Sequence, residues 1–201
     1  MPKIVDHERR REEIAHVACQ VIARHGFEQA TVARIARSAG FTTGMVAHYF
    51  ESKQQIVIAA LRLILTRMEQ RLVRSSRSGE TRLFKVLSEG LPLDAQRFAE
   101  CAFWTAFWGQ VAVDPAFKRI NAAIHREYQR LYERCFEQCW PQWHDLPAPV
   151  RTRVLRSVAA FVNGLTASAV TSRGDWPAER QIEQLRLQLE MLERWSRERK
   201  G

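Results

Sequence analysis

The sequence predicts an all-α protein, on two observations. Apolar residues recur at helical spacing almost throughout the chain, and no long stretch alternates polar and apolar residues with the period of two that marks a strand. The 201 residues are 46% hydrophobic and 26% charged, which is typical of a globular chain long enough to bury a real core. We find no repeat of fixed period and no low-complexity run. We therefore expect one or two helical domains.

The individual helices are placed by their apolar stripes and by the turn residues between them. The first carries the stripe Ile14, Val17, Ala18, Val21 and Ile22, and it stops at the glycine of HGF, residues 25–27. A second long helix follows residue 55 and ends near SSRSG at 75–79; its stripe is Val57, Leu61, Ile64, Leu65, Met68 and Leu72. Further helices are expected at about 80–90, 94–110, 116–139, 149–172 and 178–198.

Residues 31–50 hold two short helical patterns with a glycine between them. Thr31 is placed to cap the first helix, Gly40 permits a left-handed turn, and Thr42 or Thr43 caps the second. The inward positions of the first helix are Val32, Ile35, Ala36 and Ala39. This is helix-turn-helix spacing, although a helical hairpin in which Gly40 is only a C-cap has the same pattern.

The second short helix has two chemically different sides. Val46, together with Tyr49 or Phe50, must pack it against the preceding helices. The opposite side presents small, hydroxyl-bearing and polar residues, namely Thr43, Gly44, Met45, Ala47 and His48. Small side chains near a helix N-terminus allow close approach to base edges, where a threonine bonds a base or touches a thymine methyl group. Lys53 opens the next helix, where a cation and free backbone N–H groups both bind phosphate.

The segment TVARIARSAGFTTGMVAHYFESKQQI, residues 31–56, resembles the DNA-binding signature of the TetR family of bacterial transcriptional repressors. The Ala-Gly step, Thr43-Gly44, His48-Tyr49-Phe50 and Lys53 fall at that family's spacing, and the match covers three helices and about a quarter of the chain. The resemblance implies an N-terminal three-helix helix-turn-helix DNA-binding domain at residues 1–55. It also implies a larger C-terminal helical ligand-binding and dimerisation domain at residues 56–201.

This resemblance implies a set of DNA-binding residues: Thr31, Thr42, Thr43, Gly44, Met45, Ala47, His48, Tyr49 and Lys53. Thr43, Gly44 and Met45 are implied to contact base edges, and Thr31, Thr42, His48 and Lys53 to contact phosphates. Ala47 is a departure, because many members carry at that position a tyrosine that bonds a phosphate. Arg9, Arg10 and Arg11 add backbone or minor-groove contacts in one interpretation and form a solvated helix start in the other.

Two later segments indicate which subgroup of this family the chain resembles. CAFWTAFWGQVAVDPAF at 101–117 and AAFVNGLTASAV at 159–170 resemble the C-terminal domain of the betaine-responsive repressors, which control choline-to-betaine genes. In TetR-like proteins this region binds a small molecule and forms the dimer. We therefore expect a repressor that is released from operator DNA by a small-molecule effector, with choline or a related quaternary ammonium compound as the first candidate.

Aromatic residues supply candidate ligand contacts. Trp104 and Trp108 lie four residues apart on one helical face, Phe107 lies on an adjoining one, and Tyr128 comes from the next helix. Aromatic faces attract quaternary ammonium ions through the ring quadrupole. The alternative is ordinary aromatic core packing.

Apolar residues of 150–170 and 182–195 suggest two helices that form a four-helix bundle with a second copy of the chain. The residues predicted to form this dimer interface are Val158, Val162, Leu165, Leu185 and Leu189. The alternative is that they fill the core of a single chain, since both arrangements need a buried apolar face.

The charge and the cysteine content indicate the kind of partner and the compartment of the protein. The formal net charge of +9 favours a polyanionic partner such as nucleic acid, but residues 1–55 carry only eight basic against six acidic side chains, so charge alone does not locate the DNA-binding face. The first 20 residues lack the apolar stretch and the small-residue cleavage site that a signal peptide has, and the longest apolar segment is too short for a membrane helix. We expect a cytoplasmic protein in which Cys19, Cys101, Cys135 and Cys139 are reduced thiols.

Other functions find less support. Cys135 and Cys139, with His125 and His144 nearby, could ligate a metal or sense oxidants, but their spacing fits no common zinc motif, and we expect neither a metal nor a cofactor. We find no nucleophile elbow, phosphate-binding glycine loop or HExxH pattern, so we do not expect an enzyme. The alternatives to a DNA-binding regulator are a helical protein-interaction module and a cysteine-based redox- or metal-responsive regulator.

Overall fold

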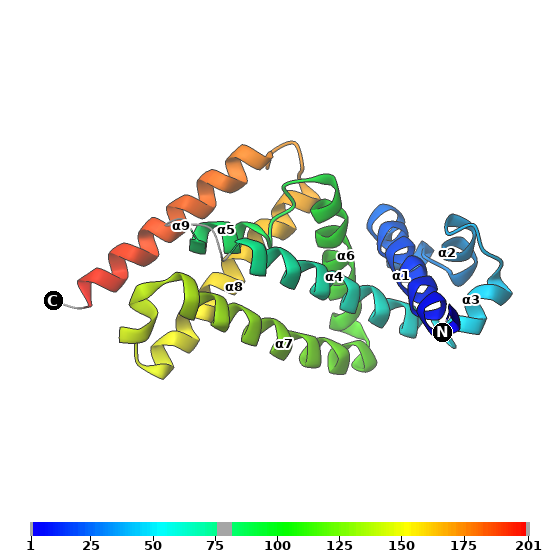
Figure 1. Ribbon diagram of the computed structural model, residues 1–201. Helices are drawn as coiled ribbons and strands as arrows, with labels where there is room; N and C mark the ends of the chain where they lie inside the picture. Colours follow the sequence, from blue (N-terminus) through cyan, green and yellow to red (C-terminus); the bar gives the residue numbers. More distant parts are fainter. Residues whose placement is uncertain (1, 76–81, 200–201) are drawn as a thin grey trace. The chain divides into compact units, whose positions relative to one another are not determined.

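The computed structural model describes residues 2–75 and 82–199, and every regular element in these ranges is a helix (Figure 1). The α-helices are α1 (Pro2–Gln29), α2 (Val32–Ser38), α3 (Thr43–Tyr49), α4 (Lys53–Ser75), α5 (Arg82–Ser88), α6 (Ala95–Val113), α7 (Pro115–Cys139), α8 (Ala148–Thr171) and α9 (Ala178–Glu198). A short 3₁₀ helix, η1 (Pro141–Asp145), joins α7 to α8. The predicted all-α class is confirmed. Apart from Ser75, the predicted break at SSRSG lies outside the described residues.

Local capping explains where several helices begin and end. The Gly26 backbone, at φ 78° and ψ 169°, leaves helical geometry close to the predicted stop of the first helix. Asp94 precedes α6 and its carboxylate accepts a bond from the Arg97 N–H at 2.8 Å. Asp114 is the single residue between α6 and α7, and its carboxylate accepts a bond from the Ala116 N–H at 2.7 Å. Pro115 then opens α7, where a missing backbone N–H costs nothing.

The chain forms two compact units, which a single cut after residue 55 does not separate. One unit comprises Met1–Arg67 with Ala99–Ala122, and the other Met68–Phe98 with Ala123–Gly201. Helices α4, α6 and α7 each contribute residues to both units, so the unit that holds α1, α2 and α3 also includes most of α6. The functional boundary predicted after residue 55 stays a prediction.

In the first unit, α1 packs against both α2 and α3. The core of this unit consists of apolar side chains from α1 to α4 and α6, including Ile14, Ile22, Ile35, Val46, Ile56, Leu61, Phe103 and Phe107, which are almost completely buried. Two helices as short as α2 and α3 are marginal on their own, because helix nucleation is costly. Their orientation is therefore set by this packing.

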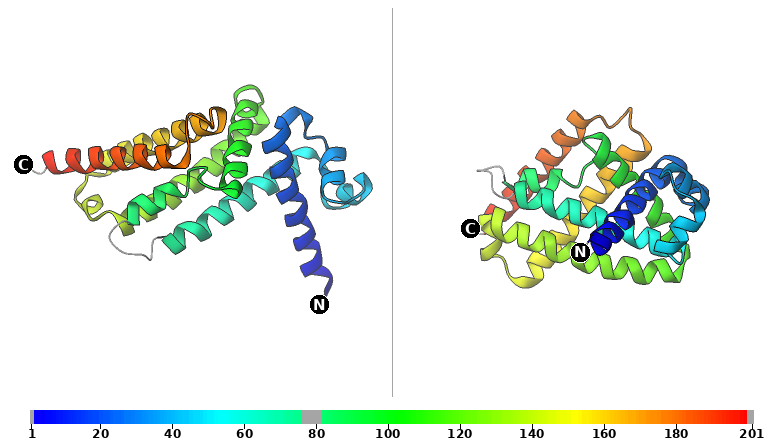
Figure 2. Two further views of the ribbon diagram at one scale, coloured as in Figure 1. Left: turned by 90° about the horizontal axis from the view of Figure 1, so that it is seen from above. Right: turned by 45° about the vertical axis from the view of Figure 1, so that its right-hand side comes forward.

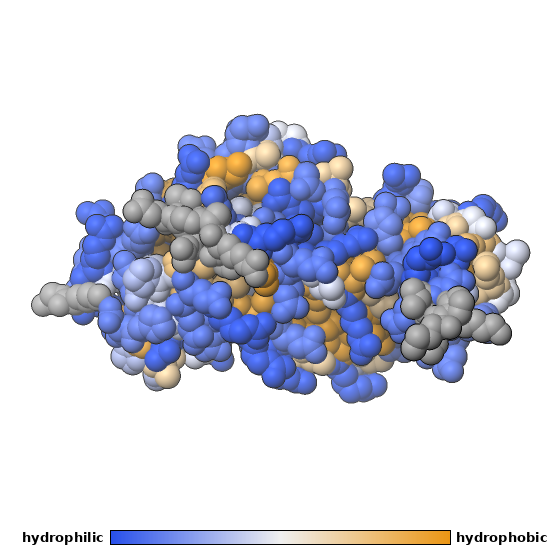
Figure 3. All heavy atoms as spheres, in the orientation of Figure 1, coloured by the Kyte–Doolittle hydropathy of each residue, from blue (hydrophilic) through white to orange (hydrophobic). Residues whose placement is uncertain are grey.

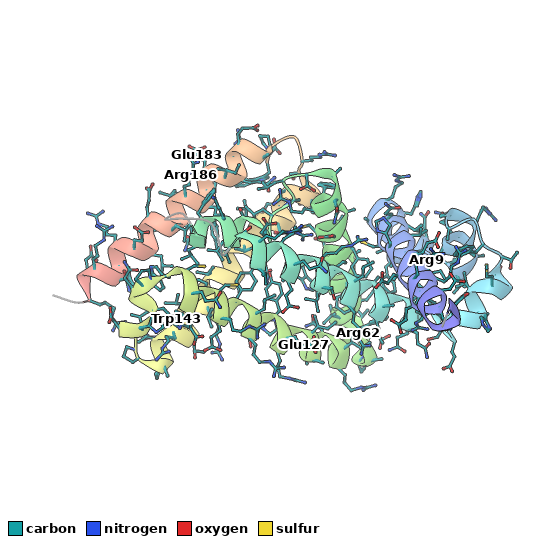
Figure 4. All side chains as sticks on the ribbon, in the orientation of Figure 1. Arg9, Arg62, Glu127, Trp143, Glu183 and Arg186 are labelled. Atoms are coloured by element: carbon teal, nitrogen blue, oxygen red, sulfur yellow. The ribbon has the colours of Figure 1, made fainter. Side chains whose placement is uncertain are left out.

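In the second unit, α8 lies beside α9, and α5 packs on α9 (Figure 2). Gly90, just after α5, sits where a Cβ would lie 3.0 Å from both the Tyr132 hydroxyl and a Val162 methyl group, so only glycine fits without a shift. The Thr166 hydroxyl donates to the Gly90 carbonyl at 3.0 Å. Trp143 of η1 is fully buried against Phe136, with ring centroids 5.3 Å apart (Figure 4).

Within the described residues one helix, α8, is long and apolar enough to cross a membrane by length and composition. One side of it fills the core of the second unit, through Val150, Val154, Val158, Val162, Leu165, Thr166 and Ala169. We interpret α8 as a core helix. In Figure 3, hydrophilic residues cover most of the visible face and hydrophobic ones reach the surface in separate patches.

Candidate nucleic-acid interface

Side-chain caps build the two short helices that form the candidate DNA-binding motif. The Thr31 hydroxyl accepts a bond from the Arg34 N–H at 3.2 Å, and the Thr42 hydroxyl accepts one from the Met45 N–H at 3.1 Å. Thr42, rather than Thr43, is therefore the N-cap of α3. Gly40, at φ 72°, supplies the left-handed turn between the helices. With the first two hydroxyls engaged as caps, the Thr43 hydroxyl is the one left to the outer side of α3.

The two sides of α3 differ in exposure as the sequence predicts. Val46 and the following Phe50 are buried in the first unit. The residues predicted to face DNA, namely Thr43, Gly44, Met45, Ala47 and His48, are all exposed. Met45 is 38% exposed, and an exposed thioether on a recognition helix is available for contact with thymine methyl groups. Contact of these residues with DNA stays a prediction.

Lys53 is held more closely within the protein than its predicted phosphate contact requires. Its Nζ donates to the Phe27 carbonyl oxygen and lies 4.3 Å from the centroid of the Phe27 ring. Burial lowers the pKa of the Lys53 ammonium group, and the Glu28 carboxylate offsets part of that shift. A phosphate contact would need this ammonium group to turn outward.

The arginines of the first helix do not share one role. Arg9 is the most exposed, with 71% of its side chain accessible and an ion pair to Asp6 at 3.1 Å (Figure 4). Arg10 pairs with Glu13 at 2.9 Å, and its guanidinium lies 5.3 Å from the centroid of the Phe41 ring. Arg9 is thus exposed to solvent and its contact with DNA stays a prediction, while Arg10 packs α1 onto the turn between α2 and α3.

The predicted ligand residues of α6 take part in a continuous series of aromatic contacts inside the first unit. Trp104 and Phe107 have ring centroids 5.7 Å apart, and Trp108 extends the series on α6, 6.3 Å from Trp104. Phe107 meets Phe117 of α7 at 5.7 Å, and Phe117 meets Phe27 at 5.3 Å, both edge to face. The Lys53 ammonium group lies over the Phe27 ring. The series of contacts therefore extends from α6 to Lys53, the first residue of α4.

Tyr128 belongs to the second unit, and the other three predicted ligand residues belong to the first. Its hydroxyl donates to the Tyr132 hydroxyl at 3.0 Å, and the two rings are 4.6 Å apart. The sequence pattern grouped Tyr128 with Trp104 because α6 and α7 are consecutive. Both helices divide between the two units, and a joint role of Trp104 and Tyr128 stays a prediction.

A buried polar network that sequence reasoning missed joins α1, α4 and α6. Glu100 is almost fully buried and lies 4.0 Å from the Arg67 guanidinium, which in turn lies 3.1 Å from His16 Nδ1. Burial, and then the Arg67 charge, lower the pKa of His16. Burial also raises the pKa of the neighbouring Cys19 thiol to about 12. The one available sequence signal is a carboxylate placed directly before the apolar run at 101–108.

Cys135 lies in surroundings that disfavour its thiolate form. Cys135 is buried, which raises its pKa to about 11. His125 is exposed, and His144 lies 3.1 Å from the Glu137 carbonyl oxygen. Over the described parts of the chain, no three or more His, Cys, Asp or Glu side chains are grouped so that they could hold a metal ion.

All five residues predicted for the dimer interface lie in the core of the second unit. Val158, Val162, Leu165, Leu185 and Leu189 are each less than a tenth exposed within one chain. Side chains already covered by their own subunit have little area left for a partner. The exposed large apolar residues of α9 are instead Leu187 and Met191.

Both parts of the chain match models of known families. Residues 14–60 match bacterial regulatory proteins of the TetR family, and residues 79–193 match the C-terminal region of BetI-type transcriptional repressors. The transcriptional regulator BetI of Stenotrophomonas maltophilia (strain R551-3) is 30% identical over 184 residues, which cover 90% of this chain and 91% of that protein.

Solved structures share the fold. A transcriptional regulator from Rhodococcus sp. Rha1 matches with a TM-score of 0.77 at 27% identity, over 90% of this chain and 94% of that one. A transcriptional regulator from Saccharomonospora viridis, solved in complex with choline, matches with a TM-score of 0.77 at 18% identity, over 91% and 96% of the two chains. These matches confirm the resemblance drawn from residues 31–56 and from the two later segments. The chain belongs to the TetR family of bacterial regulatory proteins and is a transcriptional regulator with a C-terminal region of the BetI type.

Proposed function

We propose that this protein is a homodimeric repressor, acting in the cytoplasm, that binds a two-fold symmetric operator and is released by a small cationic effector. Its family of transcriptional regulators supports DNA binding, ligand response and dimer formation in general terms. The observation that carries the proposal is the outer side of α3. There, small and polar residues are exposed on a helix whose opposite side is locked into the core.

The proposed recognition uses α3 as the helix that enters the major groove. Exposed Thr43, Gly44 and Met45 lie in its first turn, the part that a helix-turn-helix protein brings nearest to base edges. A single helix of this length reads few base pairs. Two copies related by a two-fold axis double the contacts and require a pseudo-palindromic operator.

We expect the protein to bind DNA from its own upstream region specifically, with an affinity that falls steeply as salt rises, because phosphate contacts release counterions. Thr43→Ala is expected to relax the preference at one base position in each half-site, by about 1–3 kcal/mol. The measurement is a gel shift against the operator and single-base variants. Thr171→Ala, an exposed threonine at the end of α8, is the control. Equal base preference in all three proteins would show that α3 does not read bases through Thr43.

The proposed effector is choline or a related quaternary ammonium compound. Three observations support this class: the BetI-type match, the choline complex of the Saccharomonospora viridis regulator, and the half-buried pair Trp104 and Trp108 on α6. Cation–π attraction is worth about 2 kcal/mol when the site is desolvated. Tyr128 stays in the proposed ligand set.

Calorimetric titration with choline and with its neutral tert-butyl analogue, which has the same shape, tests this proposal. We expect choline to bind at least about tenfold more tightly, because only the cation gains from the ring quadrupole. Trp104→Leu should remove most of that difference, while Trp195→Leu on α9 should preserve it. Equal binding of both compounds would indicate an apolar pocket without cation recognition, and binding of neither would remove this effector class.

A further inference from the structure

Arg11 of α1 is attached to the end of the recognition helix. Its guanidinium donates a hydrogen bond to the carbonyl oxygen of Tyr49, the last residue of α3. The same guanidinium lies over the ring of Phe50, 4.2 Å from its centroid. Tyr49 and Phe50 are 38 and 39 residues away in sequence, so nothing local to α1 signals this contact.

The backbone carbonyl groups at the C-terminal end of α3 need a hydrogen-bond donor from outside the helix. The last carbonyl groups of a helix accept no hydrogen bond within the helix, and they form the negative end of the helix dipole. Because α3 has only seven residues, it cannot hold its own orientation. Phe50 leaves the helix in an extended conformation, at φ −142°, with its ring buried. A planar guanidinium donates to the carbonyl oxygen and stacks its flat face on the ring, a stacking geometry that the compact ammonium group of lysine lacks.

Neighbouring residues of α1 reach the same region. The His7 ring lies 4.8 Å from that of Tyr49, and Arg10 lies over Phe41 in the turn before α3. His7, Arg10 and Arg11 fall three and four residues apart, on one face of α1. This face therefore contacts the recognition helix at its last residue, at the residue beyond it and at the turn before it.

We infer that Arg11 is a positioning residue for operator recognition, which sets the orientation of α3 through the Tyr49 carbonyl and the Phe50 ring. The inference rests on the proposed function, in which α3 reads base edges. A guanidinium bonded and stacked inside the protein is not offered to a DNA phosphate. Arg11 should accordingly contribute to sequence discrimination and not to counterion release.

The test compares Arg11→Ala, Arg11→Lys and wild type for binding to operator and to unrelated DNA over a range of salt concentrations. We expect Arg11→Ala to lower the ratio of specific to non-specific affinity about tenfold or more, with the salt slope of non-specific binding unchanged. Arg11→Lys keeps the charge but loses the planar stack, and it should fall between the two. Arg24→Ala, an exposed arginine of the same helix, removes one charge as a control and should leave the ratio unchanged.

A second readout separates positioning from general stability. Amide hydrogen exchange should accelerate in α3 of Arg11→Ala while α4 keeps its protection, because the local tether is lost and the core is not. Equal loss of specific and non-specific affinity, with a salt slope smaller by about one, would instead assign Arg11 to a phosphate and overturn the inference. An unchanged ratio with unchanged exchange would overturn it too. If wild type itself shows no preferred DNA, the proposed function fails, which the wild-type binding alone reveals.

Discussion

Replacing Leu187 and Met191 together with glutamate is expected to give a folded monomer that binds its operator at least about 100-fold more weakly than wild type. The two side chains are 49% and 60% exposed, and they lie four residues apart on α9. Charges introduced there do not enter the core of the subunit. They do enter the exposed face of α9 through which we propose that a second copy packs, where unpaired charges cannot be desolvated cheaply.

The adjoining helix offers a matching surface. On α8, Ala160 and Gly164 are exposed, and a Cβ at Gly164 would meet nothing within 4 Å. Although α8 is apolar enough to cross a membrane, only about a third of its apolar stretch is buried in one chain. Small residues along an apolar helix let a second helix approach closely. A second copy packed on α8 and α9 would cover this surface as a four-helix bundle.

Sedimentation at micromolar concentration and a gel shift measure the two expected effects. Arg197→Glu is the matched control, because it changes the charge by the same two units on the strongly charged side of α9, near Glu190 and Glu193. Glu183 and Arg186 fall on the same side of α9, because they precede Glu190 at helical spacing. A double variant that stays dimeric and binds the operator normally would move the dimer interface elsewhere. Loss of helical content in the variant would show that these residues support the fold instead.

The helix-turn-helix was predictable from sequence because its signals are local. Thr31 and Thr42 cap the helices within three residues, and Gly40 adopts the positive φ that the pattern requires. The inward and outward sides of α3 follow from helical periodicity alone. The predicted side of Val46 is therefore the buried one, and the predicted side of His48 the exposed one.

The assignments that were not predictable depend on contacts between distant segments. An apolar stripe on α8 or α9 shows that a face is buried but does not show what covers it. Leu185 is buried within one chain, and its part in a dimer interface stays a prediction. The partners of Arg11 and Lys53 are 38 and 26 residues away. The burial of the Glu100 carboxylate was not predictable for the same reason, because its partner, the Arg67 guanidinium, lies on α4.

Phe117→Leu is expected to uncouple effector binding from DNA binding. Phe117 is the central ring between Phe107, one of the predicted effector-binding residues, and Phe27, whose ring contacts Lys53 at the start of α4. Leucine keeps the site apolar but is smaller and has no ring edge, so both edge-to-face contacts are lost. Coupling between two sites requires an element that both bias, and this ring is the one shared by the two aromatic contacts.

The expected size follows from linkage. If choline weakens operator affinity by a certain factor, operator must weaken choline affinity by the same factor, typically about 5- to 150-fold. In Phe117→Leu we expect that factor to fall about fivefold or more, while choline affinity without DNA and operator affinity without choline each stay within about threefold of wild type. Phe84→Leu, a half-buried phenylalanine of the second unit, is the matched control.

The coupling factor should be measured both as the effect of choline on operator affinity and as the effect of operator on choline affinity. Agreement of the two values shows that the coupling itself has changed. A variant with full coupling would show that the effector signal bypasses this ring, and the buried contact between Arg67 and Glu100 would then be the next connection to test.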